Sequence, residues 1–186
     1  GPYAARAWWL LRWLGHAEVA VLDGGPAAWQ AAGGALSTEA ARPPAEQPPY
    51  PAAGQPGMPT ISAAELLQQA GRVRLFDARA PERYRGEVEP LDAQAGHIPG
   101  ARNRFFKDNL GTDGRFKPAD TLRAEWAALI GRPGAEWGVV QQCGSGVTAC
   151  HNLLAMAHAG LGESTLYPGS WSEWSADPAR PVAQGS

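Results

Sequence analysis

The feature that most constrains the fold of this chain is a short apolar run that leads through a glycine-rich loop into a helix. The run 138–140 is typical of the end of a buried strand, and residues 149–157 repeat apolar residues at helical spacing. Cys143 therefore follows the carboxyl end of a predicted strand, in the loop 143–148. A strand, a tight loop and a helix in this order are typical of α/β domains with parallel sheets.

This loop has the composition of an anion-binding site built around a cysteine. Gly144 and Gly146 permit backbone conformations that turn successive N–H groups inward, and the first amides of the helix add the positive end of its dipole. A thiol held there is stabilised as the nucleophilic thiolate. Cys143 is therefore the candidate nucleophile, and Thr148 is expected to cap the helix.

The second cysteine, Cys150, is interpreted as a small core residue because it lies within the predicted helix. We expect no disulfide with Cys143, since one thiol is in the loop and the other in the helix. Two cysteines in 186 residues favour a reducing compartment. We also expect no metal site, because Cys143, Cys150 and His151 lack the CxxC or HxxxH spacing of zinc ligands.

Other segments predict an α/β domain with a mainly parallel sheet flanked by helices. Residues 61–67 form a predicted helix in which Ser62 and Glu65 have the spacing of a capping box. Residues 73–76 form a short predicted strand that ends at Asp77. Because ligands of parallel sheets bind at the carboxyl ends of the strands, Asp77 and Cys143 are expected at one edge.

An internal repeat predicts the domain organisation. Residues 15–29 match residues 160–174 at a constant offset of 145, which superposes Gly15 on Gly160, Glu18 on Glu163, Gly24 on Gly169 and Trp29 on Trp174. We expect residues 1–32 to be a remnant of a first domain, with a helix over 4–14 and a strand from Val19 to Leu22. Residues 33–58 form an extended linker rich in proline and alanine, and residues 59–186 the second, catalytic domain.

The predicted helix 4–14 leaves two arrangements open. Trp9 and Trp13 stand four residues apart on an apolar face that would cover a sheet in an intact first domain. In one arrangement the N-terminal half of that domain exists as a separate chain or was removed from a longer precursor. In the other, the helix docks on the second domain.

Five motifs resemble the two-domain rhodanese-type sulfurtransferases over roughly residues 58–182. In chain order they are Phe76-Asp77-Ala78-Arg79, Arg83-Tyr84-Arg85-Gly86 with Glu87-Val88-Glu89-Pro90, Gly96-His97-Ile98-Pro99-Gly100-Ala101, Cys143-Gly144-Ser145-Gly146-Val147-Thr148-Ala149 and Gly169-Ser170-Trp171-Ser172-Glu173-Trp174. The loop is similar to that of the mercaptopyruvate branch, whereas thiosulfate-preferring members carry basic residues at positions 144 and 145.

The resemblance implies a rhodanese-like fold and a double displacement that requires no cofactor. Cys143 would take a sulfane sulfur from 3-mercaptopyruvate or thiosulfate as a persulfide and pass it to a thiol or cyanide. The loop residues Gly144, Gly146, Val147 and Thr148 would bind the substrate.

The resemblance also assigns roles to individual side chains. Arg83 would bind the oxyanion of the donor, although its spacing alone fits a solvated surface arginine. Ser145 would either polarise the donor or complete the hydrogen bonding of the loop. Many mercaptopyruvate enzymes have a second arginine where this chain has Asp92, which repels a carboxylate. Asp77, Arg79 and His97 are expected to be structural.

Composition excludes several other functions. A net charge of −2 provides no electrostatic footprint for nucleic acid or an anionic membrane, and the chain contains neither a long apolar run nor a signal-peptide pattern. We therefore expect a cytoplasmic protein. A cysteine phosphatase would need an arginine six residues after Cys143, where this chain has Ala149. A non-catalytic rhodanese-like binding or regulatory module is the remaining alternative.

Overall fold

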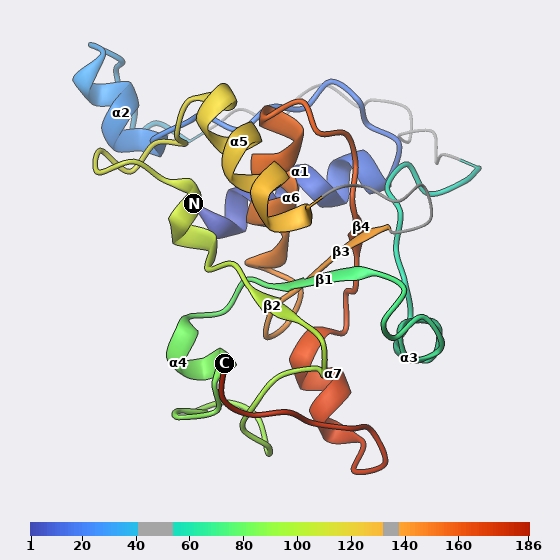
Figure 1. Ribbon diagram of the computed structural model, residues 1–186. Coiled ribbons are helices and arrows are strands. Elements are labelled where there is room, and N and C mark those ends of the chain that lie inside the picture. Colours follow the sequence, from blue (N-terminus) through green and yellow to red (C-terminus); the bar gives the residue numbers. More distant parts are fainter. Residues whose placement is uncertain (41–53, 132–137) are drawn as a thin grey trace.

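The computed structural model describes residues 1–40, 54–131 and 138–186 and contains a four-stranded parallel sheet (Figure 1). The strand order is β2 (Arg102–Asn103), β1 (Arg74–Asp77), β3 (Val139–Gln142) and β4 (Thr165–Leu166). Each neighbouring pair is parallel. The predicted α/β class and the predicted strands before Asp77 and Cys143 are therefore confirmed.

The helices cover both faces of this sheet, with α1, α5 and α6 on one side and α3 and α7 on the other (Figure 1). Their bounds are α1 Pro2–Trp13, α2 Gly25–Ala31, α3 Ala63–Gln68, α4 Pro81–Tyr84, α5 Ala119–Ile130, α6 Ala149–His158 and α7 Ser170–Ala176, with a 3-10 turn η1 at Phe106–Asn109. The α3 capping box is confirmed, because the Glu65 amide donates to Ser62 Oγ and the Ser62 amide to Glu65 Oε2.

Successive side chains of a strand point to opposite faces of the sheet, so each face has its own hydrophobic core. Leu75 and Val140 pack with Trp171 and Trp174 on the α3 and α7 side. Phe76, one residue after Leu75, packs on the opposite side with Leu122 and Trp126 of α5 and with Met156 of α6. Both cores therefore include residues of β1 or β3, the two strands that precede Ala78 and Cys143.

The N-terminal helix α1 packs against α6. Ala5, Trp8 and Trp9 of α1 are buried in one cluster with Cys150 and Leu153 of α6. Arg12 adds an ion pair with Glu163, N to O distance 2.9 Å, across the same junction.

The predicted strand from Val19 to Leu22 is wrong. These residues form no regular element, and no strand of the described chain pairs with them. A strand needs a hydrogen-bonded neighbour, whereas Val19 and Val21 instead pack sideways against the cluster of α1 and α6.

Helix α2 starts at Gly25 and α7 at Ser170, which is the offset of 145 of the predicted repeat, and both helices have seven residues.

The linker prediction falls partly outside the described residues, which omit 41–53. At its end, the Gly57 amide donates to the Trp13 carbonyl and Met58 is buried, so this stretch is tied to α1. None of the described helices is long and apolar enough to cross a membrane.

Candidate active site

The segments after β1 and β3 meet at one edge of the sheet and enclose a cavity of about 350 Å³. Asp77 and Gln142 are register partners, and the Ala78 amide donates to the Gln142 carbonyl at 2.9 Å. Asp77 and Cys143 therefore share an edge, as predicted. Besides Cys143, Gly144, Ser145, Val147 and Thr148 of the loop, the cavity is lined by Pro2, Tyr3, Ala78, Arg79, Ala80, Arg83, Leu91, Asp92, Phe105, Phe106 and Ser172.

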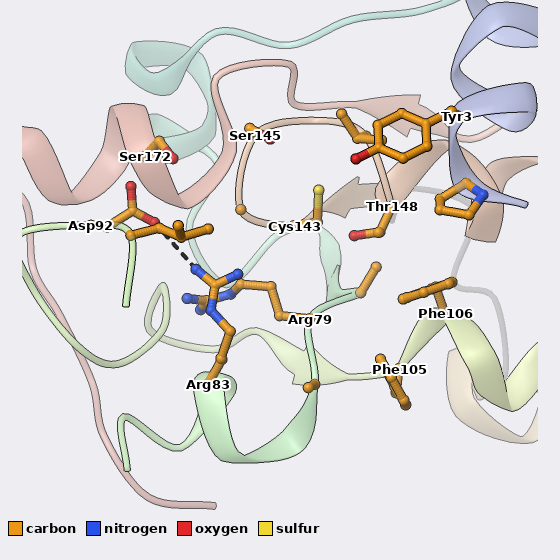
Figure 2. A pocket seen from close by; sticks show the side chains of 16 residues that line it. Tyr3, Arg79, Arg83, Asp92, Phe105, Phe106, Cys143, Ser145, Thr148 and Ser172 are labelled. Atoms are coloured by element: carbon orange, nitrogen blue, oxygen red, sulfur yellow. Dashed lines mark hydrogen bonds and ion pairs between the residues drawn. The ribbon is translucent and has the colours of Figure 1, made fainter. Parts of the chain in front are cut away.

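Cys143 lies at the centre of this cavity (Figure 2). Its side chain points between Arg79 and Arg83 on one side and Tyr3 and Thr148 on the other. The residue is 2% exposed, so the thiol is reached only through the cavity. The candidate nucleophile therefore lines the cavity and also packs in the buried cluster of α1 and α6.

The first turn of α7 anchors the loop from behind. The Cys143 amide donates to Ser170 Oγ at 3.1 Å, and the Cys143 carbonyl accepts from the Trp171 amide at 3.0 Å. The Gly144 carbonyl accepts from the Ser172 amide at 2.9 Å. In the described part of the chain, the amides of residues 144–148 donate to no protein acceptor, so they remain available for an anion.

Gly146 does not line the cavity but closes the turn behind it. Its φ is +73°, and a Cβ there would lie 2.6 Å from the Pro168 carbonyl oxygen. The position therefore requires glycine both for its backbone conformation and for the close approach of residue 168.

Arg6 of α1 reaches the same turn from the other side. Its Nη1 donates to the Gly146 carbonyl at 3.3 Å and lies 3.7 Å from Cys150 Sγ. Cys150 is fully buried, which confirms its predicted place in the core, and its thiol donates to the Gly146 carbonyl at 3.3 Å. Burial raises the pKa of Cys150 to about 11, so this thiol is not a competing nucleophile at neutral pH.

A network of buried charges forms the opposite wall. Arg79 pairs with Asp77 at 2.7 Å and with Glu89 at 3.3 Å, and both ends of these pairs are almost fully buried. Arg79 Nη2 also donates to the Gly96 carbonyl at 2.7 Å. Arg79 also lies over the Trp171 ring, 4.8 Å from its centroid, so it links the end of β1 to α7 and to the segments of Glu89 and Gly96. These contacts agree with the structural role predicted for Asp77 and Arg79.

His97 belongs to the same support. It is buried, its ring stacks on Tyr84 at 3.9 Å, and its Nδ1 lies 2.8 Å from the Tyr84 carbonyl oxygen. These contacts agree with a structural role.

Arg83 lines the cavity but is partly engaged by two carboxylates. Its Nη2 donates to Glu89 at 2.6 Å and to Asp92 at 3.4 Å. Burial raises the pKa of Glu89, but hydrogen bonds from Arg83 and from the Leu91 amide outweigh it, and the net pKa is below the ordinary value. Two carboxylates therefore already occupy one side of the guanidinium.

The expected cap by Thr148 is wrong, and one of the two alternatives for Ser145 is not observed. Thr148 stands at the N-cap of α6, but its side chain makes no capping hydrogen bond and faces the cavity instead. Ser145 is exposed and has no hydrogen-bond partner in the part of the chain that the structure describes, so its hydroxyl does not complete the bonding of the loop. Val147 and Gly144 line the cavity.

The sequence reasoning missed the contribution of α1 and η1 to the cavity. Tyr3 and Phe106 line it, although no motif singled them out. The predicted repeat could have drawn attention to Tyr3, because its offset of 145 aligns Tyr3 with Thr148 of the loop. The described residues contain no cluster of three or more His, Cys, Asp or Glu that could hold a metal ion.

Comparison with known proteins places this site in a family. Residues 60–177, which include the strands, Arg83 and the Cys143 loop, match the rhodanese-like domain. The chain belongs to the rhodanese family. Its resemblance to that family in five separate motifs is therefore confirmed.

Relatives of this rhodanese chain are sulfurtransferases by name. A Pseudomonas aeruginosa protein named "Probable 3-mercaptopyruvate sulfurtransferase" is 54% identical over 192 residues, which cover 100% of this chain and 65% of that protein. Human 3-mercaptopyruvate sulfurtransferase is 37% identical over 182 residues, 94% of this chain and 59% of that protein. The chain thus spans about two thirds or less of the relatives it matches.

Solved structures share the rhodanese fold. The Tum1 protein from Saccharomyces cerevisiae has a TM-score of 0.77 at 23% identity and is matched over 99% of this chain and 66% of its own. Wild-type EanB has a TM-score of 0.82 at 24% identity, over 98% of this chain and 44% of its own.

Proposed function

We propose that this rhodanese chain is a sulfurtransferase in which Cys143 carries sulfur as a persulfide. The observation that carries the proposal is the position of Cys143 against a cavity, inside a loop whose amides have no protein acceptor in the described chain. Such amides stabilise both the attacking thiolate and the persulfide anion that replaces it. The names of the curated relatives support the reaction class.

The first displacement loads the cysteine. The Cys143 thiolate attacks the sulfur of 3-mercaptopyruvate, the carbon–sulfur bond breaks, and its electron pair leaves with the pyruvate enolate, which takes a proton from water. With thiosulfate, the sulfur–sulfur bond breaks and sulfite leaves. Arg83 is the candidate donor to the leaving oxyanion, and the exposed hydroxyl of Ser145 is the candidate group to polarise the donor.

The second displacement transfers the sulfur from Cys143 to the acceptor. A thiolate or cyanide attacks the outer sulfur, the sulfur–sulfur bond breaks, and Cys143 returns as thiolate. No resident cofactor takes part.

The charges of the cavity favour 3-mercaptopyruvate over thiosulfate. The loop offers no basic side chain at Gly144 and Ser145, and Glu89 and Asp92 already pair with Arg83. A dianion meets more repulsion there than a monoanion does.

We also propose that residues 59–186 form the catalytic domain and that residues 1–32 are related to its last third. The equal lengths of α2 and α7 at the offset of 145 support this division.

Steady-state sulfur transfer to cyanide tests the function. Wild-type protein should give ping-pong kinetics, and Cys143→Ser should give no turnover. Cys150→Ser is the matched control and should keep turnover, since that thiol is buried away from the cavity. Turnover by Cys143→Ser would refute the assignment, and inactivity of all three proteins would favour a non-catalytic module.

A further inference from the structure

We propose that Arg83 and Asp92 form a site for an α-amino-acid head group, and that the thiol accepting sulfur from Cys143 is an amino acid of the L-cysteine type. This inference deepens the proposed function and rests on a persulfide at Cys143. It assigns Asp92 as the residue that recognises the ammonium group, whereas an arginine there would select a second carboxylate.

Arg83, whose Nε is buried without a hydrogen-bond partner in the described chain, also leaves Nη1 unused beside the cavity. Its guanidinium lies against the loop, since a Cβ on Gly144 would be 3.5 Å from Nη1 and 3.7 Å from Nη2. Nη2 is taken by Glu89 and Asp92, but Nη1 donates to no acceptor in the described residues. The side chain is 20% exposed, and this residue lines the cavity. Nη1 can therefore donate to one carboxylate of a small molecule.

Asp92 presents an unused acceptor beside it. One oxygen, Oδ2, accepts from Arg83 at 3.4 Å, and Oδ1 accepts no hydrogen bond within the described chain. The Asp92 amide donates to Glu89 Oε1 at 3.3 Å, which fixes the backbone of this residue. Asp92 also lines the cavity, with 11% of its side chain exposed. Figure 2 shows Asp92 and Arg83 joined by their ion pair on one wall of the cavity, so the unused donor and the unused acceptor belong to paired side chains.

The charge balance of this wall favours a zwitterion. Two cations, Arg79 and Arg83, are in contact with three carboxylates, Asp77, Glu89 and Asp92, so the group carries one net negative charge. A ligand with only a carboxylate is repelled by this net negative charge. A head group with both charges can place its carboxylate on Arg83 and its ammonium on Asp92.

The position of the site suits the second displacement. The Arg83 guanidinium faces Gly144, the residue after Cys143, because a Cβ on Gly144 would lie 3.5 Å from Nη1. A head group bound there would leave a side-chain thiol close to the persulfide. The acceptor thiolate attacks the outer sulfur and forms a new sulfur–sulfur bond. The bond to Cys143 breaks, its electron pair stays on Cys143, and the product is the amino-acid persulfide.

The test compares acceptors on persulfide-loaded protein, prepared with excess donor, desalted and verified by intact mass. L-cysteine carries both charges of the head group, and 3-mercaptopropionate lacks the ammonium. Transfer rates are measured for wild type, for Asp92→Asn and for Asp120→Asn, a matched control whose carboxylate is exposed and pairs with Arg123. The ratio of kcat/KM for L-cysteine to kcat/KM for 3-mercaptopropionate is compared across variants, so that intrinsic differences in reactivity between the two thiols cancel.

Asp92→Asn should lower the ratio of kcat/KM for L-cysteine to that for 3-mercaptopropionate by about tenfold or more, the size expected for one charge-assisted hydrogen bond. Asp120→Asn should leave the ratio unchanged. An unchanged ratio in Asp92→Asn would overturn the inference while leaving the persulfide mechanism intact.

A binding measurement keeps the inference testable without turnover. S-methyl-L-cysteine, which has the head group but no reactive thiol, should protect Cys143 of the unloaded protein from iodoacetamide. Protection should weaken about tenfold in Asp92→Asn. Failure of wild-type protein to form a persulfide would refute the proposed function, whereas failure of S-methyl-L-cysteine to protect would refute the head-group site alone.

Discussion

Replacing Gly146 by alanine is expected to disturb the loop around Cys143 in two separable ways. The backbone at this residue has φ of +73°, a conformation that costs an alanine roughly 1–2 kcal/mol. In addition, the new Cβ would lie 2.6 Å from the Pro168 carbonyl oxygen, whereas ordinary contact begins at 3.4 Å. The loop or residue 168 must therefore move by several tenths of an ångström.

A matched control separates these effects. Gly162 has φ of +79°, but a Cβ there meets nothing within 4 Å. Gly162→Ala should lower the free energy of unfolding by the backbone cost alone, roughly 1–2 kcal/mol. Gly146→Ala adds a clash in a packed region, which costs about 1–3 kcal/mol more. A displacement near 1 Å at the loop should also slow persulfide formation by up to about 100-fold.

Urea unfolding and the rate of alkylation of Cys143 by iodoacetamide measure the two effects. We expect Gly146→Ala to be the less stable variant and to react more slowly, while Gly162→Ala reacts like the wild type. Equal stability of the two variants, together with a wild-type reaction rate in Gly146→Ala, would refute the account of the loop.

Three further substitutions test the surroundings of the loop. Arg6→Gln should lower the free energy of unfolding by about 1 kcal/mol and slow alkylation of Cys143, because it removes the hydrogen bond to the Gly146 carbonyl. Arg12→Gln, at an exposed ion pair, should do neither. Equal alkylation rates in the two variants would contradict a role of the Arg6 hydrogen bond in holding the loop. Arg79→Met leaves Asp77 buried without its ion-pair partner and should lower the free energy of unfolding, measured in urea, by about 3–5 kcal/mol. A loss below about 1 kcal/mol, the size expected for an exposed ion pair, would contradict the importance of this buried pair. Burial lowers the pKa of His151 to about 4, so the folded protein binds fewer protons than the unfolded chain below pH 6.5. Stability should fall by up to about 3 kcal/mol between pH 6.5 and 4, and His151→Gln should show a smaller fall.

Local signals predicted several elements of residues 59–186 well. The Ser62 and Glu65 capping box needs only contacts within one turn, and the apolar runs before Asp77 and Cys143 are short enough to be strands and too short to be helices. Cys150 was assigned to the core because its neighbours in the chain form a helix. In each case the deciding interactions lie within a few residues of the sequence.

Contacts between distant segments could not be predicted in this way. Val19 to Leu22 has strand-like composition, but a strand also depends on a partner, and none pairs with it in the described chain. Thr148 has a capping residue type in a capping position, yet its side chain faces the cavity. The pairing of Arg83 with Asp92 depends on how the loop after α4 folds back.

The most direct test of the account is the intact mass of the protein after incubation with 3-mercaptopyruvate, followed by mapping of the modified peptide. We expect a gain of about 32 Da, the mass of one sulfur, located on Cys143 and removed by a thiol. Cys143→Ser should gain nothing, and Cys150→Ser should gain the same mass as wild type. Absence of the adduct in wild-type protein, or its location on Cys150, would contradict the central claim.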